Sequence, residues 1–441
     1  MATYITKTQV SATDRKKFTF SAWIKRSKLS SGSQNIYESF YDASNRITFW
    51  INSSDQLRVW YPSSGSTYAE LNSSQLLRDC NAWYHVVLTV DSTESTQADR
   101  VKVYLNGSRI TAWGTNTVNV PLNGANDIGT TGYKHNISRY GTGSGDTFFG
   151  LMSHIHLTDG YAYDASAFGS TDSTTGEWKI NTSPSVTYGN NGFFILKDGN
   201  STTDHSGNSA SFTTGGTLTK TEDNPSNVFA TGNSSYYFNG GHTFSNGNNT
   251  MYISGGWRSI ISTLGTGTGK YYAEAKFVSI HSGSNNAVAG ITALDGVIDN
   301  SIAQNLHGNL NTGSTYGLHN NGNFQAKSSY TITPYSASWT AGDIIGIAVD
   351  TENNKIYFSK NGSWQYSSDP SNGTNGVSID ANQNYGIGCS GYYNTMAMNY
   401  GNGYFGTTAV SSAGTNASGN GIFEYDVPTG YTALSTKGLN L

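Results

Sequence analysis

The apolar residues of this chain recur at every second position, in short runs separated by turn residues. In FTFSAWIKRS (18–27), every second residue from Phe18 to Ile24 is apolar. Side chains of a strand point alternately to its two faces, so this period predicts a strand with one buried face. No stretch of the 441 residues sustains the i, i+3, i+4, i+7 spacing of an amphipathic helix. The chain is therefore expected to be all-β.

Similar runs follow at short spacing through both halves of the chain. They cover residues 46–51, 56–61, 85–90, 100–105, 148–157, 270–277, 287–292, 343–350, 355–360, 385–390 and 395–401. Antiparallel strands in this number bury one face each when two sheets stack face to face. The pattern predicts two antiparallel β-sandwiches.

One hairpin pattern occurs in each half, at 83–109 and 342–364. Each stretch gives a strand ending in Val-Asp, a polar reversal, a second strand and an Asn-Gly pair. Asn-Gly supplies the positive φ angles of a type I′ turn. Both stretches are expected to be the central hairpin of a sandwich. In the second, Gly346 and Ala348 leave one strand face shallow, and Trp339 or Trp364 is expected to fill it.

A chain of 441 residues is too long for one ordinary core. We expect a first sandwich over residues 1–170 and a second over 236–441. Residues 171–235 are dense in turn formers, and only GFFILK (192–197) resembles a strand. They are expected to form a turn-rich connecting region whose short strands pack on a neighbouring domain.

Composition excludes several kinds of protein. The charge is 25 − 29 = −4 with no long basic run, which argues against nucleic-acid binding. Cys80 and Cys389 have no CxxC neighbour and are expected to be unpaired, without a disulfide framework or zinc site. No apolar stretch approaches the ~20 residues of a membrane span, and the N-terminus lacks a signal-peptide core. We expect a soluble protein made in a cytoplasm, without membrane insertion.

Motifs that would carry chemistry are incomplete. GTGTGK (265–270) departs from the phosphate-binding GxxxxGK[ST] pattern and is expected to be a hairpin loop. GTGSGD (141–146) lacks the GxSxG spacing of a nucleophile elbow. His154 and His156 are expected to share a strand face, but no third ligand lies near them in sequence. With His85, they are expected to be core or surface residues, and no catalytic residue or metal site is predicted.

Two stretches resemble known families. Residues 18–160 resemble a laminin G-like, concanavalin A-like jelly roll through FTFSAWIKRS, WYHVVLTVD, RVKVYLNGSRI and GLMSHIHLTDGYAYD. Residues 236–441 resemble a SPRY domain through GKYYAEAKF, AVAGI, GDIIGIAVDTENNKIYFSKNGSW and MNYGNGYF with VPTGYTAL. The resemblance implies lectin-type sandwiches. For the final stretch we further expect a strand at FEYD and a tail that crosses the domain.

The first resemblance also raises hydrolysis and calcium binding. Glucanases of this fold carry a Glu-x-Asp-x-x-Glu strand, and no glutamate of the chain has that spacing. Some laminin G-like domains bind Ca²⁺, for which Asp42 in YDASNRI is a candidate, although one Asp gives little affinity. The protein is expected not to be an enzyme and to need no cofactor, calcium apart.

The combination of motifs resembles structural proteins of marine tailed bacteriophages. RKKFTFSAWIKRS, FGSTDSTTGEWKI, TYGNNGFFILKD, DHSGNSASF and TEDNPSNVFAT precede the SPRY-like end. The resemblance implies a tail-fibre or receptor-binding protein on the virion exterior, with other virion proteins, a host glycan or protein, and further copies of itself as partners. The alternatives are a decoration protein of capsid or tail and, third, a polysaccharide depolymerase.

Binding residues are expected in aromatic, amide-rich loops. Aromatic rings stack on the apolar face of a sugar, while amide and backbone groups bond to its hydroxyls. Candidate loops are WYPSSGSTY (60–68), TYGLHNNGN (315–323) and SGYYNT (390–395). For the tyrosines of SGYYNT, receptor contact, packing on a neighbouring virion protein and cover of a sheet edge remain open. The predicted ligand-binding residues are Trp60, Tyr61, Tyr316, His319, Tyr392 and Tyr393.

Overall fold

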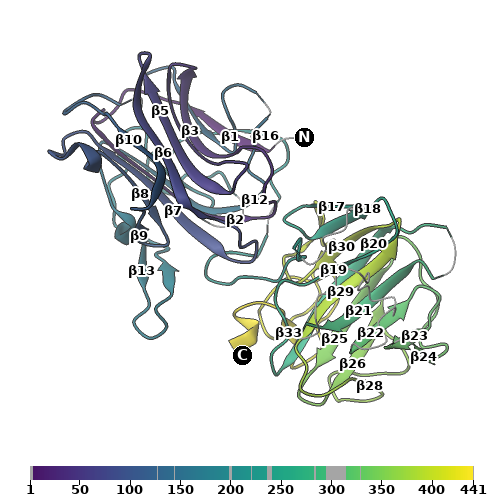
Figure 1. Cartoon of the computed structure of the whole chain (residues 1–441). Helices are drawn as coiled ribbons and strands as arrows, with labels where there is room; N and C mark the ends of the chain where they lie inside the picture. The colour runs from purple at the N-terminus through teal and green to yellow at the C-terminus, as the bar shows by residue number, and fades with distance from the viewer. Residues whose placement is uncertain are drawn as a thin grey trace. The chain divides into compact units, whose positions relative to one another are not determined.

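Strands build both halves of the computed structural model, in which residues 3–126, 128–143, 145–197, 201–219, 221–235, 241–282, 285–294, 314–327 and 329–440 are described. The chain divides into unit 1, residues 1–219, and unit 2, residues 220–441 (Figure 1). The division falls within the expected connecting region 171–235, so that part of this region joins the sheets of unit 1. Tyr236, where the second sandwich is expected to begin, lies outside the described residues.

Unit 1 contains two stacked antiparallel sheets. The eight-stranded sheet has the order β10 (Trp113–Val118), β6 (Ser66–Leu76), β5 (Gln56–Ser63), β4 (Asn45–Ile51), β3 (Gln34–Asp42), β11 (Lys134–Ile137), β1 (Tyr4–Thr8) and β16 (Thr213–Gly215). The six-stranded sheet has the order β15 (Phe193–Ile195), β12 (Gly150–Asp159), β2 (Lys17–Arg26), β7 (Trp83–Asp91), β8 (Val101–Leu105) and β9 (Ser108–Arg109). Strands β15 and β16 come from the expected connecting region.

The core of unit 1 follows the alternation of its strands. Phe18, Phe20, Ala22 and Ile24 of β2 are fully buried between the two sheets. They meet the inward side chains of β4 and β5, among them Phe49 and Val59. Every second residue of β2, β4 and β5 thus faces the core, as the period-two pattern predicts.

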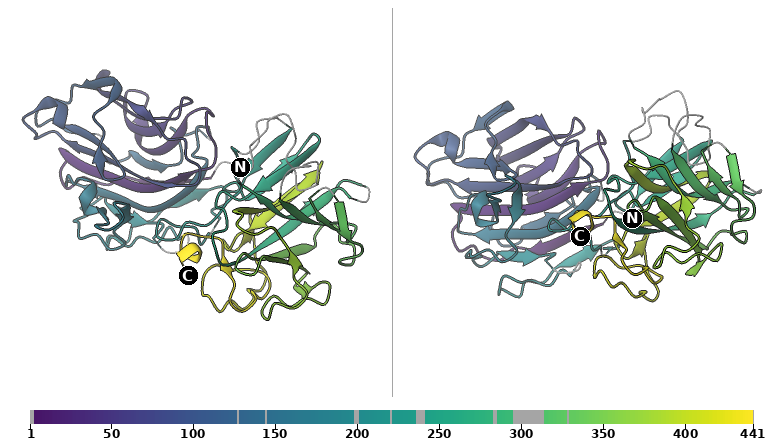
Figure 2. Two further views of the ribbon diagram at one scale, coloured as in Figure 1. Left: turned by 60° about the horizontal axis from the view of Figure 1, so that its bottom comes forward. Right: turned by 90° about the horizontal axis from the view of Figure 1, so that it is seen from below.

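Unit 2 has the same layered plan, which the further views show (Figure 2). Its nine-stranded sheet has β17 (His242–Ser245), β18 (Thr250–Ile253), β30 (Thr395–Asn399), β20 (Lys270–Ser279), β25 (Ile344–Asp350), β26 (Lys355–Lys360) and β27 (Ser363–Trp364), with β28 (Val377–Ser378) on β26 and β33 (Thr432–Ala433) parallel to β20. The six-stranded sheet has β19 (Trp257–Ile261), β29 (Tyr385–Tyr392), β21 (Ala287–Ala293), β22 (Thr315–His319), β23 (Phe324–Ala326) and β24 (Ser329–Ile332).

A further layer covers the outer face of one sheet in each unit. In unit 1, residues 161–188, here called strap 1, include η2 (Ala165–Ala167) and the hairpin of β13 (Gly169–Thr171) and β14 (Trp178–Ile180), which Figure 1 shows beyond β9. In unit 2, residues 423–431, here called strap 2, lie on the nine-stranded sheet. Next to it are β31 (Tyr404–Phe405), β32 (Thr408–Ala409) and η3 (Gly438–Asn440).

Both Asn-Gly turns have the predicted type I′ backbone. The φ angles are 47° and 82° at Asn106 and Gly107, and 48° and 82° at Asn361 and Gly362. Strand β8 turns here into β9, and β26 into β27. A short helix, η1 (Gln97–Asp99), lies in the reversal between β7 and β8.

The shallow face at Gly346 and Ala348 is filled mainly by residues outside the expected hairpin. Tyr272, Phe423 and Tyr431 form a buried cluster with Ala348, and Trp364 packs at its margin. Trp339 instead lies in the main core, 4.6 Å from the ring of Phe277. Of the two expected tryptophans, Trp364 is therefore the one on this face.

Two expectations about loops and strands are wrong, and one about the cysteines is confirmed. GTGTGK is not a hairpin loop, because β19 and β20, which it joins, belong to different sheets. FEYD forms no strand, since the backbone amides there bond to a side chain instead of a neighbouring strand. Cys80 and Cys389 are unpaired and buried, as expected. Within the described ranges the helices are three-residue 3₁₀ turns, and none has the length and apolarity to span a membrane.

Candidate binding surfaces

The outer face of the eight-stranded sheet carries a row of polar and aromatic side chains. Strand register aligns Thr117, Glu70, Trp60, Thr48, Glu38 and Asn136 across six strands. A neighbouring row runs through Asn72, Arg58 and Trp50. These residues point outward because their neighbours in each strand, such as Phe49 and Val59, face the core.

The row has a covered half and an open half. Glu38 is fully buried, and its carboxylate accepts hydrogen bonds from the backbone amide of Gly141 (2.6 Å), from Asn136 (3.1 Å) and from Thr48 (3.3 Å). Burial raises the pKa of Glu38, and these three donors oppose the rise. Glu38 therefore holds the 139–143 loop to the sheet and has no open surface.

The open half we call the tryptophan face: Trp50, Arg58, Trp60, Glu70 and Asn72. All five side chains are half-buried. The Arg58 guanidinium donates to the Glu70 carboxylate at 2.9 Å and lies 5.0 Å from the Trp50 ring. Trp50 and Trp60 are diagonal neighbours on adjacent strands, a spacing at which large rings lie side by side.

A second surface lies at one corner of unit 2. The aromatic corner, as we call it, comprises Trp257, His281, Tyr392 and Tyr393. The ring centroids lie 4.8 Å apart for Tyr392 and Tyr393, 5.6 Å for His281 and each tyrosine, and 6.2 Å for Trp257 and Tyr392. Tyr393 is 44% exposed and has a φ of 52°, because the chain passes here from one sheet to the other.

Three of the predicted ligand-binding residues lie in the core, and their prediction as loop residues is wrong. Tyr61 is fully buried because it follows outward-facing Trp60 on β5. Tyr316 and His319 lie on β22, which is buried along its whole length. The Tyr316 hydroxyl accepts from the backbone amide of Asp380 at 3.0 Å, and Nε2 of His319 lies 2.6 Å from Oε1 of Gln325.

The structure brings Tyr392 and Tyr393 together at the aromatic corner and places Trp60 in the tryptophan face. Sequence reasoning missed Trp50 and Arg58, although the alternation in RITFWI and QLRVWY indicates that both point outward. It also missed Trp257 and His281, which no local pattern connects to the tyrosines. Asp42 is exposed at the β3–β4 turn, and its carboxylate accepts from Ser44 and Asn45 of the same turn.

His85 and His156 are buried on the outer face of the six-stranded sheet, where Phe168 and Trp178 of strap 1 cover them. The indole N–H of Trp178 donates to Nδ1 of His85 at 3.0 Å, so the ring hydrogen is on Nε2, which lies 2.8 Å from Ser21 Oγ. His85 therefore donates to Ser21 and is not placed to take its proton. Burial lowers the pKa of His85 to about 3 and that of His156 well below its ordinary value. Within the described ranges no group of three or more His, Cys, Asp or Glu side chains is placed to hold a metal ion.

Comparison with known proteins agrees with this architecture. Residues 2–162 match the concanavalin A-like lectin/glucanases superfamily, and residues 296–373 match the SPRY domain. The chain thus contains a concanavalin A-like domain and a SPRY domain, folds whose lectin-like sandwiches indicate a binding role. A search of curated protein sequences gives no match.

Several solved structures are similar over part of the chain. The SPRY domain of human HERC1 is 18% identical, with 36% of this chain and 91% of that one covered, at a TM-score of 0.28. A heptameric SAP-like pentraxin of Limulus polyphemus is 16% identical, with 48% and 88% covered, at 0.30. Domain 4 of a Geobacillus stearothermophilus arabinanase, solved with arabinotriose, is 19% identical, with 35% and 64% covered, at 0.26.

Proposed function

We propose that this chain is a non-catalytic adhesin that binds a surface glycan through the tryptophan face of unit 1. The observation that carries the proposal is the diagonal pair Trp50 and Trp60 on the outer face of the eight-stranded sheet. Two half-exposed indoles give adjacent apolar platforms for the C–H faces of consecutive sugars. Glu70, Arg58 and Asn72 beside them offer acceptors and donors for sugar hydroxyls.

The position of the carboxylates supports binding over hydrolysis. Glu38 and Glu70 lie in the same row but three strands apart, on the order of 14 Å at the usual strand spacing. Glycosidases use two carboxylates roughly 5–10 Å apart. Glu38 is also buried beneath the 139–143 loop, where no substrate reaches it.

The virion setting comes from the resemblance of the sequence motifs to those of tailed-phage structural proteins. In this proposal the chain is displayed on the exterior of the particle, attached to other virion proteins, and several copies act together. Single sugar contacts of this kind are weak, so avidity from a homo-oligomer would supply the strength of adhesion. The aromatic corner is then a second contact surface, toward the host or toward a neighbouring virion protein. Neither a cofactor nor nucleic acid is needed.

Binding of the full chain to host-cell polysaccharide tests the proposal. We expect the polysaccharide to retain the protein, and Trp50→Ala and Trp60→Ala to weaken retention at least tenfold. Tyr161→Ala, in strap 1 over the opposite sheet, is the control. Retention by purified virions but not by polysaccharide would favour the decoration protein. Release of reducing ends from the polysaccharide would instead show a depolymerase.

A further inference from the structure

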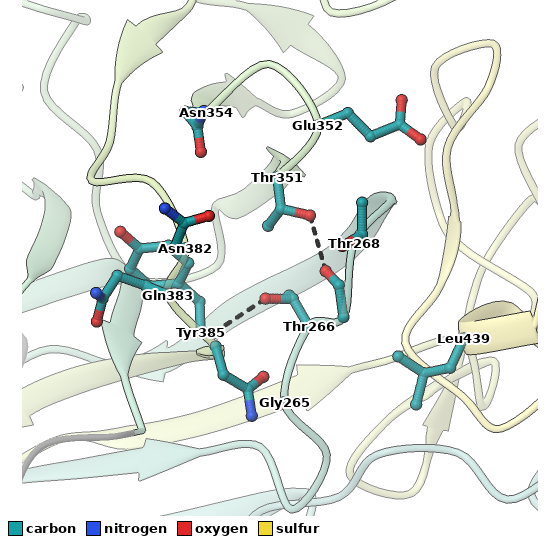
Figure 3. A pocket seen from close by; sticks show the side chains of 12 residues that line it. Gly265, Thr266, Thr268, Thr351, Glu352, Asn354, Asn382, Gln383, Tyr385 and Leu439 are labelled. Atoms are coloured by element: carbon teal, nitrogen blue, oxygen red, sulfur yellow. Dashed lines mark hydrogen bonds between the residues drawn. The ribbon is translucent and has the colours of Figure 1, made fainter.

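A pocket lies at one end of unit 2, where three loops meet. It has a volume of about 660 Å³ and is lined by the β19–β20 loop, the β25–β26 turn, the residues before β29, and Leu439 of η3 (Figure 3). A second pocket of about 510 Å³ shares Thr268, Glu352 and Leu439 with the first, so the two are adjacent. We call them together the end pocket.

The floor of the end pocket is fixed by hydrogen bonds within the protein. The Thr351 hydroxyl lies 2.7 Å from the carbonyl of Gly267 and accepts from the amide of Gly269 at 2.9 Å. Thr266 and Tyr385 exchange two bonds, of 2.8 and 3.0 Å. These bonds hold residues 265–268, here called the GTGT loop. A ligand would therefore bind to a floor that is already ordered, at little cost in entropy.

Four polar side chains of the wall are not used by the protein. Within the described ranges Glu352, Asn354, Asn382 and Gln383 form no side-chain hydrogen bond or ion pair. Figure 3 shows Asn354, Asn382 and Gln383 together on one side of the pocket and Leu439 on the opposite side. Each amide offers two donors and an acceptor, an arrangement that suits a ligand rich in hydroxyls.

The second pocket is lined in part by Tyr431, which is 1% exposed. Its hydroxyl is buried away from the pocket space, so Tyr431 supports the wall and offers no polar group to a ligand. Tyr271 and Leu439 add apolar surface beside it.

The charges of the lining exclude an anionic ligand. Glu352 is the only ionised side chain that lines the first pocket. Lys270 of the second pocket lies 3.5 Å from Asp350 and is already paired. A phosphate or an acidic sugar would meet an unbalanced carboxylate without a free cation.

We propose that the end pocket binds a short neutral oligosaccharide. The amides of Asn354, Asn382 and Gln383 bond to its hydroxyls, and Leu439 contacts the apolar edge of a ring. This site lies in the other unit from the tryptophan face and does not depend on it. One chain would then hold a glycan at two places.

Titration of the full chain with maltohexaose, cellohexaose and chitohexaose tests the site, with sulfated dextran as an anionic probe. We expect at least one hexasaccharide to bind the Trp60→Ala variant. That binding should weaken at least fivefold in the double variant Asn382→Ala/Gln383→Ala and severalfold in Leu439→Ala, which removes the apolar contact to the sugar ring.

Three results would overturn the assignment: no hexasaccharide bound by Trp60→Ala, binding unchanged in both end-pocket variants, or preference for sulfated dextran. In the first case, binding by the unaltered chain that Trp60→Ala abolishes would leave the proposed function standing. Asn372→Ala, in an exposed loop outside the pocket lining, is the matched control and should leave affinity unchanged.

Discussion

The two straps cover equivalent sheets with opposite chemistry. Strap 1 bonds to its sheet mainly through backbone carbonyls: Thr158 donates to Tyr161 at 2.8 Å and Thr89 to Tyr163 at 2.6 Å, while the Tyr163 amide donates to Thr19. Strap 2 offers amides: those of Glu424 and Tyr425 each donate to the Glu274 carboxylate at 2.9 Å. Hydroxyl donors suit the first and a buried acceptor suits the second, because a buried backbone group needs a partner of opposite polarity.

Each strap also packs an aromatic ring on a glycine of an Asn-Gly turn. The Trp178 ring of strap 1 packs over Gly107, where an added Cβ would lie 2.4 Å from the indole. The Tyr425 ring of strap 2 packs over Gly362 in the corresponding turn, at 2.6 Å. Each type I′ turn therefore both ends a hairpin and provides, at its glycine, a surface on which an aromatic ring packs. The two straps thus show that sequences without local similarity can cover the same kind of sheet face.

Loss of the Glu274 carboxylate should have the largest effect. Glu274→Ala leaves the amides of Glu424 and Tyr425 and the side chain of Asn399 without their acceptor. We expect unit 2 to lose about 3 kcal/mol or more of unfolding free energy. Urea unfolding, with limited proteolysis to assign peptides to each unit, measures it. Glu352→Gln, at an exposed position, is the control and should change little.

Loss of the Trp178 ring should come next. Trp178→Ala removes the stack on His85, whose ring centroid lies 5.9 Å away, and the donor to Nδ1. We expect unit 1 to lose about 2–3 kcal/mol and residues 161–188 to exchange their amide hydrogens faster. Trp60→Ala, a half-buried tryptophan on the other sheet, should lose less. An equal loss in both variants would show that strap 1 contributes little.

The two units should respond to pH in opposite directions. Burial lowers the pKa of His85 to about 3, so the unfolded chain takes up the proton first, and unit 1 loses stability as pH falls below 6.5. Burial raises the pKa of Glu274 to about 7 against its four donors, so the folded chain holds the proton, and unit 2 loses stability as pH rises from about 4.5 to 7.

His85 and Glu274 should each contribute about 2 kcal/mol between pH 5 and 7, and the lowered pKa values of His156 and His135 add to the effect of His85 in unit 1. The groups facing His85 are Ser21, Trp23, Phe168 and Trp178, none of them charged. Those facing Glu274 are Tyr272, Asn399 and the amides of strap 2. Urea unfolding midpoints of the two units, measured at pH 5, 6 and 7, test this opposite pH dependence. Midpoints that move together would contradict the comparison.

The turn glycines should give the smallest effect. Gly107→Ala and Gly362→Ala strain a positive φ and displace a ring, and we expect each to cost its unit about 1–2 kcal/mol. Gly65→Ala and Gly373→Ala are matched controls: their φ angles are 81° and 83°, but nothing lies within 4 Å of an added Cβ. The difference from the controls isolates the contact between turn and strap. Equal losses of unfolding free energy in the variants and their controls would show that the ring contacts add no stability.

Several features of the fold could be predicted from sequence because they are local. Alternation fixes which side of β2 faces the core, and Asn-Gly fixes the turns after β8 and β26. The same alternation placed Trp60 outward and, read more strictly, would have placed Tyr61 inward. The burial of Tyr316 and His319 could not be predicted in this way, because β22 is buried on both faces. A period of two reveals only a strand with one buried face.

What the sequence alone determined, then, is the period of the strands, the turns between them and hence two lectin-type sandwiches. What only the tertiary structure decided is which distant segments meet: the straps on their sheets, Trp257 with Tyr392, and the GTGT loop with Leu439. The physical reason is that these contacts join residues far apart in the chain, whose pairing depends on complementary shape and polarity and not on any repeat within a segment.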